Sequence, residues 1–417
     1  MTASPTPPDD TGLDVGRFPP AFRLACACSR WPASPERDAA VHAAAAGVDW
    51  ASFLRVVARQ RIPGLAYAAL LAAGVELPAA AREQLATAAR TTSARGLALA
   101  AESLRLARLM EAEGIEPRLI KGAAVAQLAY GSQAIKQGRD IDLLAPPADA
   151  ERAFQVLRRE GYVNVHPAGE LTAAQRRLVF RLHKDIEFLH PVRGFSLELH
   201  WRLIDNPALL AGFGAGSAAQ EVAVLNGRLK TLADPELFVY LCVHGATHAW
   251  FRLKWLADLN AWLAGKSDDE IAGFHRFARS LGVDACTGQA LLLRQRLFGA
   301  APPAALAGEL RTAKLRWLVA VALDAMVGRD AETEIYQRPF GLFRLLPAQF
   351  VRGRGAAFFF GQCKLLLENL DDMLMYPLPR ALHFLYPLLR LPLWLVRIVR
   401  RRAQMNRPQG AGASISS

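Results

Sequence analysis

The sequence predicts an α+β fold in which a small mixed β-sheet is flanked by helical regions on both sides. Residues 21 to about 112, and the chain after Asp234, are rich in apolar residues at three- and four-residue spacing, which is typical of helices. Between them, residues 117–203 contain short apolar runs of strand length that alternate with helical segments. The 417 residues are 52% hydrophobic and 21% charged, which is enough for a full core and excludes a disordered protein.

The N-terminal part is predicted to consist of a tail and a helical region. Residues 1–20 are acidic and rich in proline, and they have neither the charged start nor the apolar stretch of a signal peptide, so we predict a disordered tail. Residues 21–112 are predicted to form the helical N-terminal region. Its helical spacing is clearest in the apolar side chains Trp50, Phe53, Leu54 and Val57.

The pattern changes after Gly114, and residues 113–232 are predicted to form the domain that contains the sheet. Four runs of strand length are RLIKG (118–122), DIDLLA (140–145), DIEFLH (185–190) and FSLELHW (195–201). Helical segments are predicted at 122–131 and 148–160.

Residues 233–350 are predicted to form a second helical domain. Asp234 and Pro235 are residue types that begin helices. They start a long amphipathic run that continues to Ala264, which we interpret as one helix.

The C-terminal segment is basic and apolar. Residues 351–417 contain ten basic and three acidic residues, so they supply +7 of the net charge of +12. We predict basic, apolar helices over 351–405 and a flexible tail over 406–417. The most apolar stretch, 381–399, contains two arginines and two prolines, which a membrane-spanning helix rarely tolerates.

Two interpretations of this segment remain open. Residues 381–402 could lie in the interface of an anionic membrane, with aromatic rings near the headgroups and Arg397–Arg402 on the lipid. Alternatively, the segment is a buried helix that caps the domain, and its basic end meets RNA or solvent. In either case the net charge of +12 favours polyanionic partners such as nucleotides, nucleic acid or anionic lipid.

The cysteines indicate a reducing compartment. The five cysteines are sparse, odd in number and without the spacing of a metal site, which argues against a disulfide framework. We therefore predict a cytoplasmic protein, with peripheral contact to the inner membrane as the further option.

Two neighbouring carboxylates predict a metal site. Asp140 and Asp142 are two residues apart in a predicted strand, so their side chains project from the same face. Such a pair is electrostatically costly unless a cation lies between the two groups, and Mg²⁺ (or Mn²⁺) prefers oxygen ligands of this kind. Lys121 and Gly122 end the preceding strand and open a helix, whose N-terminus can receive a phosphate.

A third carboxylate is expected in a site that holds two metal ions. In the predicted hairpin, Asp185 and Glu187 share one face of the first strand, and Glu198 and His200 share one face of the second. We favour Glu198 as the third acid, and Asp185 is the alternative.

These motifs resemble a known family. The motifs are Lys121-Gly122, Arg-Asp-Ile-Asp-Leu-Leu (139–144), Glu-Gly-Tyr (160–162) and Leu-Glu-Leu-His-Trp (197–201), followed by His-x-x-x-His and Lys-Trp-Leu-x-Asp-Leu. Together they look like the uncharacterised bacterial nucleotidyltransferase family, a branch of the DNA-polymerase-β-like nucleotidyltransferase superfamily. The resemblance spans roughly residues 115–265 and implies a polymerase-β-like fold for the domain with the sheet.

The resemblance also implies an activity. It implies Mg²⁺-dependent transfer of a nucleoside monophosphate from an NTP such as ATP to a hydroxyl acceptor. Asp140 and Asp142 would bind the metals, and Glu198 would complete the site as the third acid. Lys121 and the backbone of Gly122 would hold the phosphates.

Several points stay open within this resemblance. Arg139 would either hold a phosphate or neutralise the paired aspartates. The acceptor would be a small molecule or sugar in polysaccharide or natural-product biosynthesis, an RNA 3′ end, or a protein side chain. The superfamily has Gly-Ser or Gly-Gly where this chain has Gly122-Ala123. This departure supports an alternative, a catalytically degenerate protein that acts as a nucleotide sensor or scaffold.

Two histidines lie in the predicted second helical domain. On a single helix, His244, His248, Trp255 and Asp258 would share one face. We interpret this face as packing on the catalytic domain, with the histidines hydrogen-bonded at the interface. A role in closing over the nucleotide base is the alternative.

Overall fold

The computed structural model describes residues 15–338, 341–390 and 392–393. The predicted tail of residues 406–417 lies outside this part of the chain, and so do residues 1–14 of the predicted N-terminal tail. The described end of that tail contains a short 3-10 helix, Val15–Arg17, and the first α-helix begins at Pro20.

Five strands form one mixed sheet in the order β1-β2-β5-β4-β3. Their bounds are β1 Arg118–Leu119, β2 Asp140–Leu144, β3 Val163–His166, β4 Asp185–Leu189 and β5 Ser196–His200. β2 runs parallel to β5, and the other neighbouring pairs are antiparallel. The four strands predicted from the sequence are confirmed, and with the surrounding helices they form an α+β fold.

Two β elements were not predicted. The edge strand β3 buries Asn164 and exposes Val163 and Val165, which is opposite to the polarity expected of a strand. A separate hairpin, β6 (Ala219–Val224) and β7 (Gly227–Leu232), joins the sheet region to the helices that follow.

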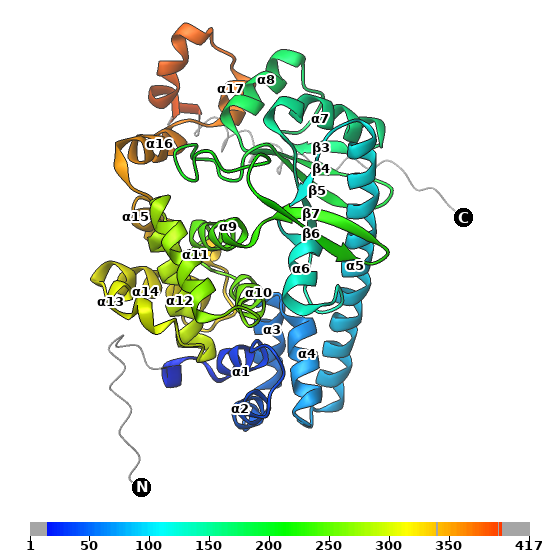
Figure 1. The fold of residues 1–417 in the computed structure, drawn as a ribbon, viewed down its shortest axis with the longest axis vertical. Coiled ribbons are helices and arrows are strands. Elements are labelled where there is room, and N and C mark those ends of the chain that lie inside the picture. Colours follow the sequence, from blue (N-terminus) through cyan, green and yellow to red (C-terminus); the bar gives the residue numbers. More distant parts are fainter. Residues whose placement is uncertain (1–14, 339–340, 391, 394–417) are drawn as a thin grey trace, which may run out of the picture.

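Helices precede the sheet in the chain, as predicted. They are α1 Pro20–Cys28, α2 Pro35–Ala45, α3 Trp50–Gln60, α4 Pro63–Ala72 and the 34-residue α5 Ala79–Ala112. In Figure 1, α5 runs along one side of the molecule, past α4 and then past the sheet. Its early residue Leu85 packs in the core of the helices, and its later residues Leu99 to Met110 pack in the core under the sheet. The helix therefore connects the two cores.

Three helices accompany the sheet strands: α6 Gly122–Tyr130, α7 Ala150–Arg159 and α8 Ala173–Leu182. The first two confirm the helical segments predicted from the sequence. After the hairpin come α9 Asp234–Thr247, α10 Leu253–Leu263, α11 Asp268–Ser280, α12 Asp284–Phe298, α13 Ala307–Leu310 and α14 Ala313–Met326. The described C-terminal segment adds α15 Gly341–Gln349, α16 Gly355–Leu367, α17 Leu370–Met375 and the 3-10 helix η5 Arg380–Leu385.

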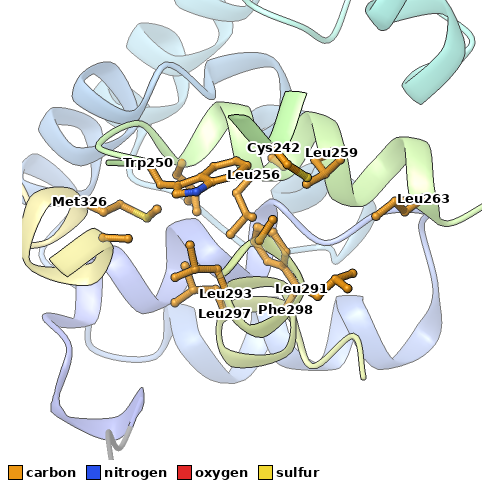
Figure 2. Packing of buried hydrophobic residues seen from close by; sticks show 14 of the residues in the cluster. Cys242, Trp250, Leu256, Leu259, Leu263, Leu291, Leu293, Leu297, Phe298 and Met326 are labelled. Atoms are coloured by element: carbon orange, nitrogen blue, oxygen red, sulfur yellow. The ribbon is translucent and has the colours of Figure 1, made fainter. Parts of the chain in front are cut away.

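One hydrophobic core joins helices from both ends of the chain. It contains apolar side chains of α1, α3 and α4 together with those of α9 to α14. Figure 2 shows a part of this core, where Trp250 and Leu256 lie over Leu293, and Met326 lies to one side of Trp250. The helices before and after the sheet therefore depend on each other for burial.

The prediction of a single helix after Asp234 is wrong. α9 ends at Thr247 and α10 begins at Leu253, because the chain between them turns back with positive φ angles at Ala249 (47°) and Trp250 (50°). The turn places the Trp250 side chain, which is fully buried, against Gly245 of α9. A sequence-based helical pattern does not detect this turn, because its cause is the burial of one large aromatic ring.

Gly245→Ala is expected to destabilise the protein by about 2 kcal/mol. A Cβ atom at this position would lie 2.4 Å from two atoms of the buried Trp250 ring, which cannot move without disturbing the core. The matched control is Gly273→Ala in α11, where the nearest atom to an added Cβ is the end of the flexible Arg276 side chain at 3.8 Å. This second change is expected to be neutral or stabilising by up to about 1 kcal/mol, because alanine favours a helix. Denaturant unfolding measures both, and equal midpoints would contradict the packing argument.

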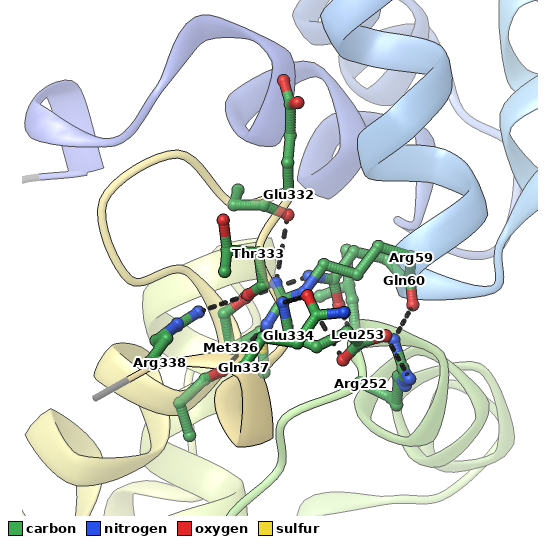
Figure 3. Close-up of polar contacts among 12 residues, drawn as sticks. Arg59, Gln60, Arg252, Leu253, Met326, Glu332, Thr333, Glu334, Gln337 and Arg338 are labelled. Carbon is green, nitrogen blue, oxygen red and sulfur yellow. Dashed lines mark hydrogen bonds and ion pairs between the residues drawn. The ribbon is translucent and has the colours of Figure 1, made fainter. Parts of the chain in front are cut away.

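A buried polar network fastens α3 to the segment after α14 (Figure 3). Glu334 pairs with Arg252 at 2.5 Å and with Arg59 at 3.8 Å. Arg59 also donates hydrogen bonds to the carbonyl oxygens of Ala325 and Ala331, both at 3.0 Å. All three charged side chains are buried or nearly so.

The structure describes only part of the C-terminal segment. Residues 381–390 and 392–393 are the described portion of the segment predicted to contact membrane. Among the described residues, no helix combines the length and the apolar character needed to cross a bilayer. The five cysteines all lie in the described part and are free.

Candidate functional site

The sheet places three of its polar side chains together at the boundary between β2 and β5. In the parallel register, Asp142 of β2 lies opposite Glu198 of β5, and His200 follows two residues later on the same face. One ligand atom from each of Asp142, Glu198 and His200 lies within 4.8 Å of the other two. Asp142 and His200 are buried, and Glu198 is partly exposed.

Lys121 completes this cluster from the start of α6. Its Nζ lies 2.6 Å from Asp142 Oδ1, and its side chain is 19% exposed. The next residue, Gly122, has a φ of +59°, a left-handed conformation that glycine adopts without strain. The turn brings the N-terminus of α6 to the edge of β2, where an added Cβ on Gly122 would lie 3.9 Å from the carbonyl oxygen of Asp140.

The cluster carries two cations beside its carboxylates. Burial alone would raise the pKa of Asp142, but Lys121 and His200 hold it well below its usual range. Burial would likewise lower the pKa of His200, but the neighbouring carboxylates of Asp142 and Glu198 raise it to about 9. His200 Nε2 lies 3.0 Å from Glu198 Oε2 and 3.5 Å from Asp142 Oδ1. Asp142 is therefore ionised and His200 protonated near neutral pH.

Asp140 and Arg139 lie at the entry to β2. Asp140 is partly exposed, and its pKa is raised by burial and by the charge of Asp142. Arg139 is exposed, and its carbonyl oxygen accepts a hydrogen bond from Arg95 at 3.3 Å. The pKa of Lys254 is lowered to about 7 by burial and by Lys136. Its Nζ donates to the carbonyl oxygen of Gln137, three residues before Asp140.

The alternative acid, Asp185, is the first residue of β4, which lies on the opposite side of β5 from β2. In the antiparallel register of β4 and β5 it is opposite His200, and its Oδ2 lies 3.6 Å from His200 Nδ1. It also pairs with Lys184. Burial would raise the pKa of Asp185, but His200 and Lys184 lower it. Glu198 is thus next to Asp142, whereas Asp185 is separated from Asp142 by the width of β5.

A cavity of about 660 Å³ opens over this face of the sheet. Its floor is formed by Lys121, Asp185, Glu187, Glu198 and His200. The predicted site residues Arg139, Asp140 and Asp142 are not among the described residues that line it. The volume is in the range of sites that enclose small molecules. The cavity therefore reaches the predicted third acid and the predicted phosphate-binding lysine from the side of β4.

Residues from two later parts of the chain form the walls of this cavity. Tyr240, His244 and His248 contribute from α9 and its end. Lys364 and Leu365 of α16, together with Arg390, contribute from the C-terminal segment. In Figure 1, α9 and α16 lie on the side of the sheet away from α5.

The two histidines join an aromatic cluster although the helix is broken between them and Trp255. The ring centres of His244 and His248 are 4.7 Å apart, and both lie within 5.4 Å of the Trp255 ring. Asp258 instead accepts a hydrogen bond from Tyr130 of α6 at 2.9 Å and pairs with Lys136. The histidine rings are thus both packed and in contact with the cavity.

Sequence reasoning placed His200 beside Glu198 but did not include it among the site residues. The signal that identifies it is the two-residue spacing from Glu198 in a strand. Sequence reasoning did not identify Lys184. This residue pairs with Asp185 and lines the cavity, and its position depends on the path of the chain from α8 into β4.

Comparisons with known proteins agree with the motifs. The family model of the uncharacterised nucleotidyltransferases matches residues 46–299, which is more than half of the chain. No curated protein and no solved structure matches. The matched range contains the whole sheet, the acidic cluster and α9 to α12. The chain belongs to the uncharacterised nucleotidyltransferase family.

Proposed function

We propose that the protein is a Mg²⁺- or Mn²⁺-dependent nucleotidyltransferase with a polymerase-β-like catalytic domain. It transfers a nucleoside monophosphate from an NTP to the hydroxyl group of a small molecule. Family membership supports nucleotidyl transfer in general. The observation that carries the proposal is the cluster of Asp142 and Glu198 in adjacent strands, with Lys121 2.6 Å from Asp142 at the start of a helix.

The donor set fits a divalent cation. Asp142 Oδ1 is buried and receives no hydrogen bond of good geometry from any residue that the structure describes. Its near neighbours are the cationic groups of Lys121 and His200, and a metal ion bound here would take the place of one of these charges at the carboxylate. Asp140, Asp142 and Glu198 would hold the metal ions. These ions would neutralise the triphosphate and lower the pKa of the acceptor hydroxyl.

The chain's own residues then have defined roles. Lys121 and the N-terminus of α6 at Gly122 hold the phosphates, with Arg139 as a further cation at the entry to β2. The acceptor oxygen forms a bond to the α-phosphorus as the bond to the β-phosphate oxygen breaks, so pyrophosphate leaves. Glu198, which faces the cavity, helps to take up the hydroxyl proton.

A small acceptor is favoured by the limited volume of the cavity, about 660 Å³. Its lining comes from the sheet on one side and from α9, α16 and Arg390 on the others. A sugar or comparable metabolite fits such a space, whereas an RNA 3′ end or a protein side chain needs an open groove.

A second candidate function is a nucleotide sensor or scaffold that binds NTP without catalysing nucleotidyl transfer. Lys121 and His200 already neutralise Asp142, so the cluster is balanced without a metal ion. The alanine after Gly122, where the superfamily has serine or glycine, agrees with this second candidate.

Release of pyrophosphate from each of the four NTPs, with Mg²⁺ or Mn²⁺, tests the proposed activity. Cell extract supplies acceptors, and the double variant Asp140→Asn/Asp142→Asn is the reference. Release by the wild type that is lost in the double variant supports the transferase and names its nucleotide. NTP binding without release supports the sensor, and no binding contradicts the site.

Glu198→Gln is expected to lower the rate of pyrophosphate release by about a hundredfold or more, because it removes the acid beside Asp142. Asp185→Asn is the matched comparison on the next strand, and we expect less than about a tenfold loss. Thermal melting of both variants controls for folding. A larger loss for Asp185→Asn than for Glu198→Gln would assign the third acid to Asp185.

A further inference from the structure

Exposed apolar side chains concentrate in the C-terminal part of the chain. In the part that the structure describes, sixteen large hydrophobic side chains are exposed, and nine of them lie between residues 343 and 388. All four phenylalanines of that set are among the nine: Phe343, Phe359, Phe360 and Phe384. A soluble monomer rarely leaves so many large apolar groups exposed in one short segment, and such groups mark a surface that meets a partner.

α16 shows the arrangement most clearly. Its inward side chains Phe358 and Gln362 are buried at 2% and 6% exposure. Its outward side carries Phe359, Leu366 and Leu367, which lie on one stripe and are 39–49% exposed, and Phe360 beside them at 68%. Lys364 is the single charged residue in this helix. A surface helix normally turns polar residues outward, so α16 is built to have apolar surroundings on both sides.

The segment after α16 continues this character. Leu382, Phe384 and Leu388 are 39%, 67% and 73% exposed. In Figure 1, α16 and the last described residues lie at the same end of the molecule. We call the exposed apolar side chains of residues 359–388 the C-terminal apolar surface.

The charge that follows this surface selects among partners. The surface itself, residues 359–388, contains two basic and three acidic residues, whereas residues 389–407, of which the structure describes only a part, contain six arginines and no acidic residue. A second copy of the chain would bring the same six arginines to the contact, and the two sets would repel each other. An anionic bilayer offers an apolar interior to the phenylalanines and leucines and negative headgroups to the arginines.

We infer that the C-terminal apolar surface docks on an anionic lipid membrane. The docked protein lies on the bilayer and does not cross it. Lys364 and Leu365 of α16, and Arg390, also line the cavity over the sheet. Docking therefore places this wall of the cavity next to the bilayer. This inference concerns a separate surface and does not depend on catalytic activity.

Sedimentation of the full chain with vesicles tests the inference. Vesicles of phosphatidylcholine are compared with vesicles of equal parts phosphatidylcholine and phosphatidylglycerol. The variant Phe360→Ser/Leu388→Ser removes two side chains that are 68% and 73% exposed. The matched control Leu71→Ser/Val192→Ser removes two that are 69% and 89% exposed elsewhere. All four positions are exposed, so neither variant is expected to alter folding, and thermal melting checks this.

The wild type and the control are expected to bind the anionic vesicles, and added salt is expected to weaken binding. The surface variant is expected to bind at least tenfold more weakly, because two large apolar groups no longer enter the lipid. Failure of the wild type to bind, or equal binding by both variants, would overturn the inference. A wild-type dimer that the surface variant converts to a monomer, without vesicle binding, would instead assign the surface to a second copy. RNA binding without vesicle binding would also overturn the inference.

Discussion

Asp142→Asn is expected to reduce pyrophosphate release by more than about a thousandfold. Asp142 is the most buried carboxylate of the cluster, and it is the one that contacts both Lys121 and His200. Asparagine keeps the size of the side chain but removes the negative charge that a divalent cation requires. Turnover of the preferred NTP, measured at saturating metal, gives the loss directly.

The same substitution is expected to weaken the fold, and this effect has to be separated from catalysis. Without Asp142, the charges of Lys121 and His200 face each other in a buried site with less compensation, which is costly. The double variant Asp142→Asn/Lys121→Met removes one of these cations together with the acid. We expect it to regain part of the lost stability and none of the lost activity.

Glu221→Gln is the control for this experiment. Glu221 lies on β6 in the separate hairpin, its side chain is 51% exposed, and it is not among the described residues that line the cavity. We expect the activity of this variant to stay within about threefold of the wild type. If the double variant recovered both stability and turnover, the role of Asp142 would be structural and the metal site would lie elsewhere.

Much of the sheet could be predicted because its strands carry local signals. The strand Asp-Ile-Asp-Leu-Leu begins with alternating polar and apolar residues and ends in buried apolar ones. The strand with Leu-Glu-Leu-His places its two polar side chains on one face. Both strands are confirmed, and the side-by-side position of Asp142 and Glu198 follows once β2 and β5 pair.

The features that could not be predicted depend on residues distant in the sequence. Lys184 lies over Asp185 only because of the path from α8 into β4. The end of α9 is set by the burial of Trp250, and a helical pattern that continues through residue 264 gives no sign of it. The cavity wall formed by α16 and Arg390 lies outside the family match of residues 46–299. Local periodicity contains no information about such contacts.

Substitution of Glu334 is expected to cause the largest loss of stability. Arg59 and Arg252 are 3% and 6% exposed, and the Glu334 carboxylate is the acidic group that pairs with both of them in the described structure. Burial already lowers the pKa of Arg59 to about 10, which shows how much its charge depends on compensation. Glu334→Gln would leave two buried guanidinium groups without an acidic partner. We expect a loss of about 3–5 kcal/mol in the free energy of unfolding.

The matched control lies two residues earlier in the chain, at Glu332. Its carboxylate accepts hydrogen bonds from Ser52 at 2.5 Å and from Arg55 at 2.6 Å, and the Arg55 side chain is 57% exposed. Because water can solvate Arg55 when the pair is broken, Glu332→Gln is expected to cause only a small fraction of that loss. Denaturant unfolding of the two variants measures the difference. Equal losses would mean that the ion pairs of this segment contribute through exposed contacts, and that the buried network does not hold α3 to the helices after the sheet.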